Sequence, residues 1–249
     1  MRVAFLFFFL CLCAPTRAAE SINLALPSGA ELQVQRHAAA RPDAPLLLWL
    51  TGEYGPIAAE AQAAADLARR GVEVHLADWL APYFLPQLPR SLGEIPDADL
   101  SAWLAETQRR YPERRLMLLA AGHAAEPLLR AAARWPGAQQ HAPLPTVLLF
   151  PLLYRGVDAG AEPEYAPVVD ATRLDLALLV PKASAGYWWR ERLQARLEAA
   201  GSHVRQNVLN GMRDGFYRRS DASETETAAG ARLGDLIHSL LQPWLPTAP

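Results

Sequence analysis

Short apolar runs alternate with longer segments of helical periodicity along most of this chain. Residues 46–50 (LLLWL), 145–150 and 174–180 are apolar almost without interruption, which is typical of strands buried on both faces of a sheet. Further strands are predicted at residues 72–77, 115–120 and 204–209. Helices are predicted at residues 57–70, 97–111, 124–135, 187–200 and 222–241. Two of these helices are followed by a glycine that can cap them, Gly71 and Gly201.

A hairpin is predicted before this alternation begins. Residues 22–26 and 31–36 alternate apolar and polar side chains, and the turn-forming segment Pro27-Ser28-Gly29 lies between them. Strands that alternate with helices form a largely parallel sheet covered by helices. We therefore predict a single three-layer α/β/α domain over residues 19–249, with a mainly parallel sheet of about eight strands and an N-terminal hairpin. No internal repeat or long linker divides it.

The first 18 residues have the pattern of a signal peptide. Arg2 precedes an apolar run over residues 3–12, and small residues follow up to Ala18, where we place the cleavage site. The run is shorter than the ~20 residues that span a bilayer. We therefore expect a periplasmic or secreted protein without a transmembrane segment after cleavage, and a retained membrane anchor is the alternative.

Charge and composition exclude several classes of function. The chain has 24 basic and 26 acidic residues and no basic run of the kind that binds nucleic acid. Both cysteines, Cys11 and Cys13, lie in the segment that would be removed. The six histidines show no spacing typical of metal ligands, and no glycine-rich phosphate loop is present. We therefore expect no metal, no cofactor and no thiol nucleophile.

Three loops that follow predicted strands carry the candidate functional residues. Ligands of an open parallel sheet bind beyond the carboxyl ends of its strands, where such loops lie. The loops are residues 51–55 (TGEYG), 121–126 (AGHAAE) and 210–216 (NGMRDGF).

In this order, the segments resemble the α/β-hydrolase family. LLLWLTGEYG resembles the segment that carries the oxyanion loop, and LMLLAAGHAAEPLL resembles the nucleophile elbow, usually G-x-S-x-G. VLNGMRDGFY resembles the segment that ends in His-Gly-Phe in the dienelactone-hydrolase branch. LTGEYG and LADWLAPYF are faintly similar to the periplasmic VirJ-type family. The resemblance implies an α/β-hydrolase fold, and the VirJ-type similarity favours a lipid or envelope setting.

The residues of the catalytic triad do not match that family. Aligned on Gly122, the elbow has Ala124 at the serine position, and the late loop has Asp214 at the histidine position. No acid follows the strand at residues 174–180, where Ser184 lies instead. A methyl group cannot attack a carbonyl, and a carboxylate is a poor base for a serine hydroxyl. The three positions predict that triad catalysis is lost.

Our first hypothesis is a non-catalytic protein that binds a small molecule, a lipid fragment or an envelope protein. Aromatic and polar side chains after the strands would line its cleft. The candidates are Thr51, Glu53, Tyr54, Trp79, Tyr83, His123, Trp188 and Phe216. Alternatively, the aromatic residues only cover the end of the sheet. We also considered that Glu53 and Arg213 pair across the mouth of the cleft.

The second hypothesis is an atypical secreted ester or lipid hydrolase. It would use Thr51, Ser184 or Ser101 as nucleophile and His123 as base.

Overall fold

The structure is a computed structural model that describes residues 19–135, 137, 143–155 and 162–246. The expected signal peptide lies outside these residues. The strands of the main sheet are β1 (Glu20–Ala25), β2 (Glu31–His37), β3 (Leu46–Leu50), β4 (Glu73–Ala77), β5 (Leu116–Ala121), β6 (Pro145–Leu149), β9 (Asp175–Pro181) and β10 (His203–Leu209). Each predicted strand is present, with its ends within two residues of the prediction.

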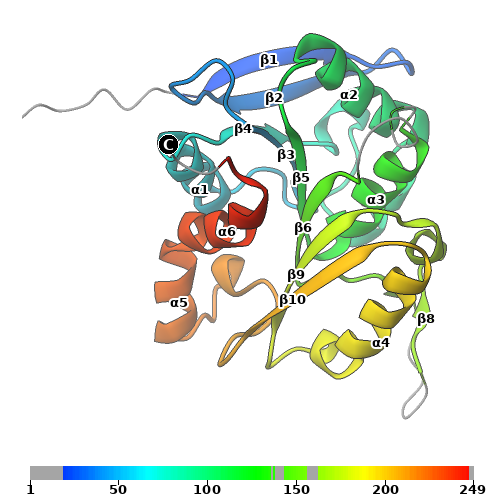
Figure 1. Cartoon of the computed structure of the whole chain (residues 1–249), viewed down its shortest axis with the longest axis vertical. Coiled ribbons are helices and arrows are strands. Elements are labelled where there is room, and N and C mark those ends of the chain that lie inside the picture. The colour runs from blue at the N-terminus through cyan, green and yellow to red at the C-terminus, as the bar shows by residue number, and fades with distance from the viewer. Residues whose placement is uncertain (1–18, 136, 138–142, 156–161, 247–249) are drawn as a thin grey trace, which may run out of the picture.

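The main sheet has eight strands in the order β1-β2-β4-β3-β5-β6-β9-β10. The hairpin β1–β2 is antiparallel and joins β4 in antiparallel register, and all the other neighbours are parallel. The predicted mainly parallel sheet with an N-terminal hairpin is therefore confirmed (Figure 1). Because β3, β4, β5, β6, β9 and β10 run the same way, their carboxyl ends share one edge of the sheet.

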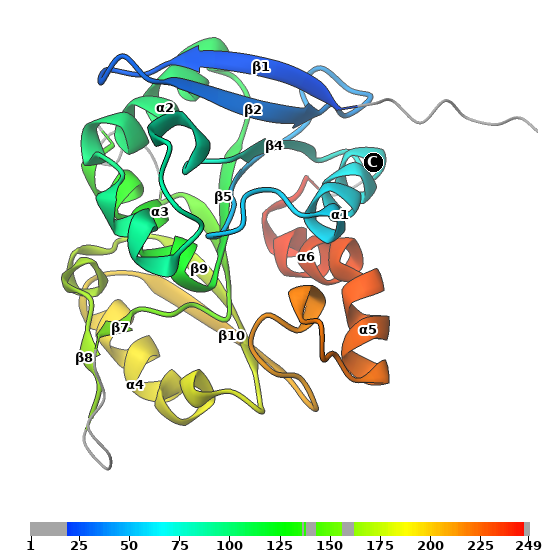
Figure 2. The same ribbon diagram turned by 180° about the vertical axis from the view of Figure 1, so that it is seen from behind.

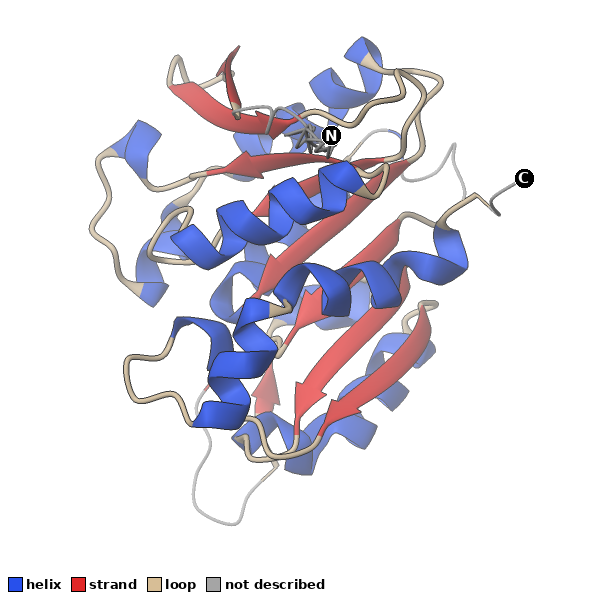
Figure 3. Ribbon diagram, turned by 90° about the vertical axis from the view of Figure 1, so that its left-hand side faces the viewer, coloured by secondary structure: helices blue, strands red, loops and turns tan. Residues whose placement is uncertain are grey.

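Helices cover both faces of this sheet (Figures 1 and 2). On one face lie α1 (Ala58–Arg69), α5 (Glu224–Ala231) and α6 (Leu233–Leu241). On the other face lie α2 (Asp97–Arg110), α3 (Ala125–Arg134) and α4 (Ala185–Ala199). A view turned by 90° shows the strands between the two helical layers (Figure 3). The three-layer α/β/α domain is therefore confirmed.

Two apolar clusters, one on each face, form the core. β3, β4, β5 and β6 are buried along their whole length, as expected for strands covered on both faces. Alternate residues of β3 enter different clusters, with Leu48 on the face of α2 and α3 and Trp49 on the face of α1 and α6. Because successive side chains of a strand point to opposite faces of the sheet, each central strand contributes to both clusters.

Two segments differ from the sequence prediction. The closing helix expected over residues 222–241 is interrupted at Arg232, whose φ of −110° and ψ of 22° are not helical. At Gly230 in α5, a Cβ would lie 3.2 Å from the Tyr217 Cα. This close packing brings α5 against the late loop, and α6 then turns onto α1. A short antiparallel ribbon, β7 (Tyr154–Arg155) with β8 (Glu164–Tyr165), lies in the loop between β6 and β9 and was not predicted.

Candidate functional site

The turn between β5 and α3 is the sharp strand-to-helix turn predicted from the elbow motif. Its left-handed residue is Gly122, with φ of +58°. In the elbow of α/β-hydrolases, the nucleophile occupies the strained position of this turn. Ala124 has an ordinary helical φ of −68° and is fully buried in the core beneath α3. The left-handed position of the turn is therefore Gly122, two residues before Ala124, and it has no side chain.

The space above Gly122 is filled by the side chain of Arg218. A Cβ on Gly122 would lie 3.1 Å from Arg218 Nη2, one on Gly52 would lie 2.9 Å from Nη1, and one on Gly215 would lie 2.9 Å from Nε. These three glycines leave β3, β5 and β10, so the guanidinium lies where the oxyanion loop, the elbow and the late loop meet. A side chain at any of these three positions would displace the guanidinium from this place.

Arg218 is held in this place by a carboxylate and two aromatic rings. Its Nη2 lies 3.6 Å from Glu53 Oε1, and the two side chains are only 16% and 5% exposed. The guanidinium carbon also lies 5.7 Å from the ring centroids of both Tyr54 and Phe150. The expected pairing of Glu53 with Arg213 is wrong. Arg213 instead donates hydrogen bonds to Glu226 and Asp221 on the far side of the late loop.

His123 follows Gly122 and is half-buried beside this ion pair. Burial lowers the pKa of His123, with opposing contributions from Glu53 and Arg218. The ring is therefore predominantly neutral at pH 7. It is the candidate that the sequence placed best, because the turn holds it at the carboxyl edge of the sheet.

Ser184 and Asp214, the two other residues that the sequence comparison placed at triad positions, lie near each other. The Ser184 hydroxyl donates to the Pro181 carbonyl oxygen at 2.7 Å, and its oxygen lies near the Asp214 carboxylate. Burial raises the pKa of Asp214, and the nearby Ser184 hydroxyl partly offsets this. The fold thus brings the end of β9 to the late loop after β10, as the family resemblance implied, but without an imidazole between them.

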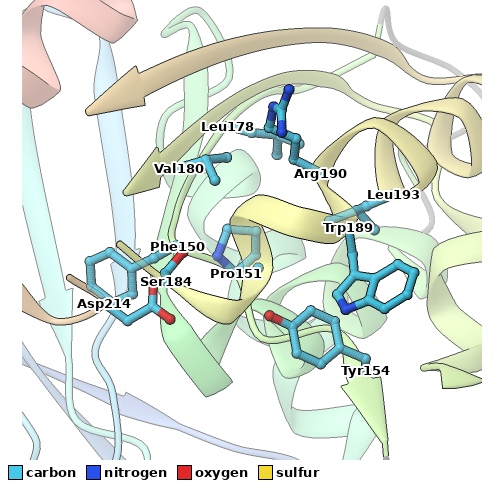
Figure 4. A pocket seen from close by; sticks show the side chains of 11 residues that line it. Phe150, Pro151, Tyr154, Leu178, Val180, Ser184, Trp189, Arg190, Leu193 and Asp214 are labelled. Carbon is cyan, nitrogen blue, oxygen red and sulfur yellow. The ribbon is translucent and has the colours of Figure 1, made fainter. Parts of the chain in front are cut away.

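A narrow crevice opens next to Ser184 and Asp214 (Figure 4). The segment after β6 contributes Phe150, Pro151 and Tyr154, and α4 contributes the other wall. The full lining comprises Phe150, Pro151, Tyr154, Leu178, Val180, Ser184, Gly186, Trp189, Arg190, Leu193 and Asp214. The space that admits the centre of a water molecule is only ≈ 10 Å³, enough for about one water. Sequence reasoning missed Tyr154 and Trp189 because nothing near them resembles a motif.

Several side chains predicted to line a cleft do not do so. Trp79 is buried against Trp103 with a centroid separation of 5.6 Å, and Phe216 is buried against Phe150 and Tyr217. These two predictions are wrong because both rings are needed to fill the core. Thr51 is also buried, and Tyr83 donates to Asp99 from a partly buried position.

The remaining predicted residues lie at the surface. Tyr54 is 53% exposed and Trp188 is 79% exposed on the first turn of α4. Neither lines the crevice. Of the candidates, only Glu53, Tyr54 and His123 surround Arg218.

None of the three alternative nucleophiles contacts His123. The Thr51 hydroxyl donates to the Ala77 carbonyl at 2.9 Å. The Ser101 hydroxyl lies on α2, 2.9 Å from the Asp97 carbonyl, and Ser184 contacts Pro181 and Asp214 as described above. A hydroxyl bound to a carbonyl oxygen has no base to remove its proton.

No set of three or more His, Cys, Asp and Glu residues that could hold a metal ion is found among the residues described. In the same part of the chain, no helix is long and apolar enough to cross a bilayer.

Comparison with known proteins identifies the fold. No family model and no curated protein sequence matches the chain. Among solved structures, a protein from Klebsiella pneumoniae assigned as a dienelactone hydrolase superposes with a TM-score of 0.65 at 15% identity, over 91% of this chain and 100% of its own.

Two esterases are similarly close. Carboxyl esterase 2 from the fungus Tuber melanosporum has a TM-score of 0.64 at 12% identity, over 94% of this chain and 89% of its own. A thermophilic esterase from Thermogutta terrifontis has a TM-score of 0.63 at 12% identity, over 94% and 96%. With the strand order and the elbow between β5 and α3, these superpositions show that the chain has the α/β-hydrolase fold.

Proposed function

We propose that this protein is a non-catalytic binding protein built on the α/β-hydrolase fold. The observation that carries the proposal is the position of Arg218, whose guanidinium fills the space above Gly122. A substrate carbonyl would have to occupy that space to be attacked from the elbow. The centre therefore has neither a nucleophile nor room for the reacting group.

The charges of the centre also disfavour acyl transfer. Triad catalysis needs an imidazole that takes the proton of the nucleophile and is itself oriented by a carboxylate. Here Asp214 takes the position of the imidazole, and its partner is the Ser184 hydroxyl. Glu53 lies in the oxyanion loop, where its negative charge would repel a developing oxyanion rather than stabilise it.

The proposal includes export to the periplasm or the medium, after removal of residues 1–18. The support is the sequence pattern of Arg2, the apolar run and the small residues up to Ala18. Its ligand there is a small molecule or a lipid fragment, and an envelope protein is the alternative partner. N-terminal sequencing of the purified mature protein tests this part, and a retained Met1 on membrane-bound protein would contradict it.

The test of the catalytic part uses purified mature chain. It is incubated with p-nitrophenyl acetate and butyrate, and separately with a fluorophosphonate that labels activated serines. An esterase of the same fold serves as positive control. We expect only background hydrolysis and no covalent adduct by mass spectrometry, because no activated hydroxyl faces the cleft.

An atypical hydrolase is the second candidate, since the superposed structures include esterases. It predicts saturable ester hydrolysis by wild type that is lost in His123→Ala or Ser184→Ala. That result would overturn the non-catalytic proposal.

A further inference from the structure

The crevice beside Ser184 and Asp214 has an apolar body and one polar end. Leu178 and Val180 of β9, with Leu193 and Trp189 of α4, form apolar walls. The polar end carries the Tyr154 hydroxyl, which points toward the side of Ser184 and Asp214 (Figure 4). Such a division between apolar walls and a few placed polar groups is typical of small-molecule sites.

The Tyr154 hydroxyl has a proton to donate and no acceptor among the residues that the structure describes. Its oxygen is buried, and none of the described residues hydrogen-bonds to it. It lies 2.9 Å from the point where a Cβ of Gly186 would stand, and the Ser184 hydroxyl lies 3.9 Å from the same point. Glycine at position 186 therefore leaves this polar end open. A buried hydroxyl without a partner costs about 1–3 kcal/mol, which a ligand oxygen can recover.

The charges around the crevice exclude an ionised ligand. Asp214 would repel a carboxylate, and the cation in the lining, Arg190, is already engaged. Arg190 donates to the Tyr187 carbonyl at 2.8 Å and to Glu191 at 2.6 Å. A cationic ligand would have to compete for Asp214 with Ser184 and with the nearby charge of Arg218. An uncharged ligand meets neither obstacle.

We propose that this crevice binds a small uncharged molecule with an apolar body and one acceptor oxygen, to which Tyr154 donates a hydrogen bond. The inference rests on the proposed function, because it assigns the crevice to retention of a ligand rather than to turnover. As it stands, the crevice holds about one water. A larger body enters only when a lining side chain such as Trp189 or Arg190 moves, so binding of simple probes is weak.

The test uses four probes that share one aromatic ring and differ in the attached group. They are benzyl alcohol, toluene, benzoate and benzylamine, and each is titrated into the ¹⁵N-labelled mature chain. The reporter is the indole N–H signal of Trp189, identified by its loss in Trp189→Phe. We expect saturable shifts with benzyl alcohol and about five-fold weaker binding of toluene, the ratio that one hydrogen bond of about 1 kcal/mol gives. Benzoate and benzylamine should bind at least ten-fold more weakly than benzyl alcohol.

Two variants and one control test whether the probes bind in the crevice. Tyr154→Phe should reduce benzyl alcohol to the affinity of toluene. Gly186→Ala should abolish binding of all probes, because its methyl group fills the polar end, while alanine suits the helix. Tyr187→Phe, a neighbouring tyrosine outside the lining, should change nothing.

Three results would overturn the proposal. The first is the absence of any saturable shift of the Trp189 indole signal. The second is tighter binding of benzoate or benzylamine than of benzyl alcohol. The third is a preference for benzyl alcohol over toluene that is unchanged in both Tyr154→Phe and Gly186→Ala. Each can occur in a protein that is inert toward esters, so failure of the ligand class is distinguishable from failure of the proposed function.

Discussion

Replacing Glu60 by glutamine should remove a pH dependence of stability that wild type has between pH 5 and pH 8. Glu60 is 2% exposed in the first turn of α1. Burial raises the pKa of Glu60 to about 7. Two hydrogen bonds partly oppose this shift. The Tyr217 hydroxyl donates to Glu60 Oε1 at 2.9 Å, and the Ile57 N–H donates to the same carboxylate. A carboxyl with a raised folded pKa contributes stability that is fully present below its unfolded pKa, near 4.5, and is lost as the pH rises through 7.

The magnitude follows from the two pKa values. Each unit of difference corresponds to ~1.4 kcal/mol, so the full loss approaches ~3.4 kcal/mol at high pH. About 0.9 kcal/mol of it has already occurred at pH 5, where the unfolded chain is mostly ionised. Between pH 5 and pH 8, wild type should therefore lose roughly 2.5 kcal/mol through this one group. That is a large share of a typical unfolding free energy of about 5–15 kcal/mol.

The assay is urea denaturation of wild type and Glu60→Gln at pH 5, 6, 7 and 8 and constant ionic strength, with linear extrapolation to water. Burial lowers the pKa of His37, His75, His123 and His238, which gives a pH dependence of opposite sign, but these residues are present in both proteins and cancel in the difference. The stability of Glu60→Gln relative to wild type should rise steadily with pH. Glu94→Gln, at an exposed position, is the control and should give no trend. A difference that stays within 0.5 kcal/mol, or falls with pH, would refute the reasoning.

Three further predictions concern the centre and its rim. Gly122→Ser should lower stability by about 1–3 kcal/mol, because its Cβ meets Arg218 at a left-handed φ, and it should add no esterase activity in a p-nitrophenyl ester assay. Arg218→Met should cost about 3 kcal/mol in urea denaturation because it leaves Glu53 buried without its cation, and adding Glu53→Gln should recover at least half of that loss. Phe84 is 96% exposed and has a left-handed φ of +53°, which glycine adopts without strain. Phe84→Gly should therefore raise the melting temperature or leave it unchanged. A lower melting temperature would show that the ring packs against the protein.

The fold was predictable because burial on both faces leaves a clear mark in the sequence. Strands such as Leu46–Leu50 are apolar throughout, and Gly71 and Gly201 mark the ends of helices. The break at Arg232 was not predicted although Gly230 and Gly234 flank it, because isolated glycines are tolerated within helices. What interrupts the helix is a tertiary contact, the approach of Gly230 to Tyr217.

The candidate site was predictable only in part. The loops were placed correctly, but the left-handed residue of the turn is Gly122 and not Ala124, because Gly122 resembles the first glycine of the motif. Arg218 was missed because it lies in a short segment after the late loop and has no motif of its own. The available signal was indirect, namely glycines at positions 52, 122 and 215 in three separate loops, and only the structure shows that one side chain occupies all three spaces.

The packing of Arg218 against three glycines has an evolutionary consequence. A serine at position 122 would press on Arg218, and a smaller residue 218 would relieve this contact but leave Glu53 without its cation. Each first step toward an active centre therefore lowers stability while it adds no activity, since the members of a triad work as a unit. A substitution that contributes to activity in the complete centre therefore lowers stability when it occurs alone. If the centre is non-catalytic as proposed, this sign epistasis holds the lineage in its present arrangement.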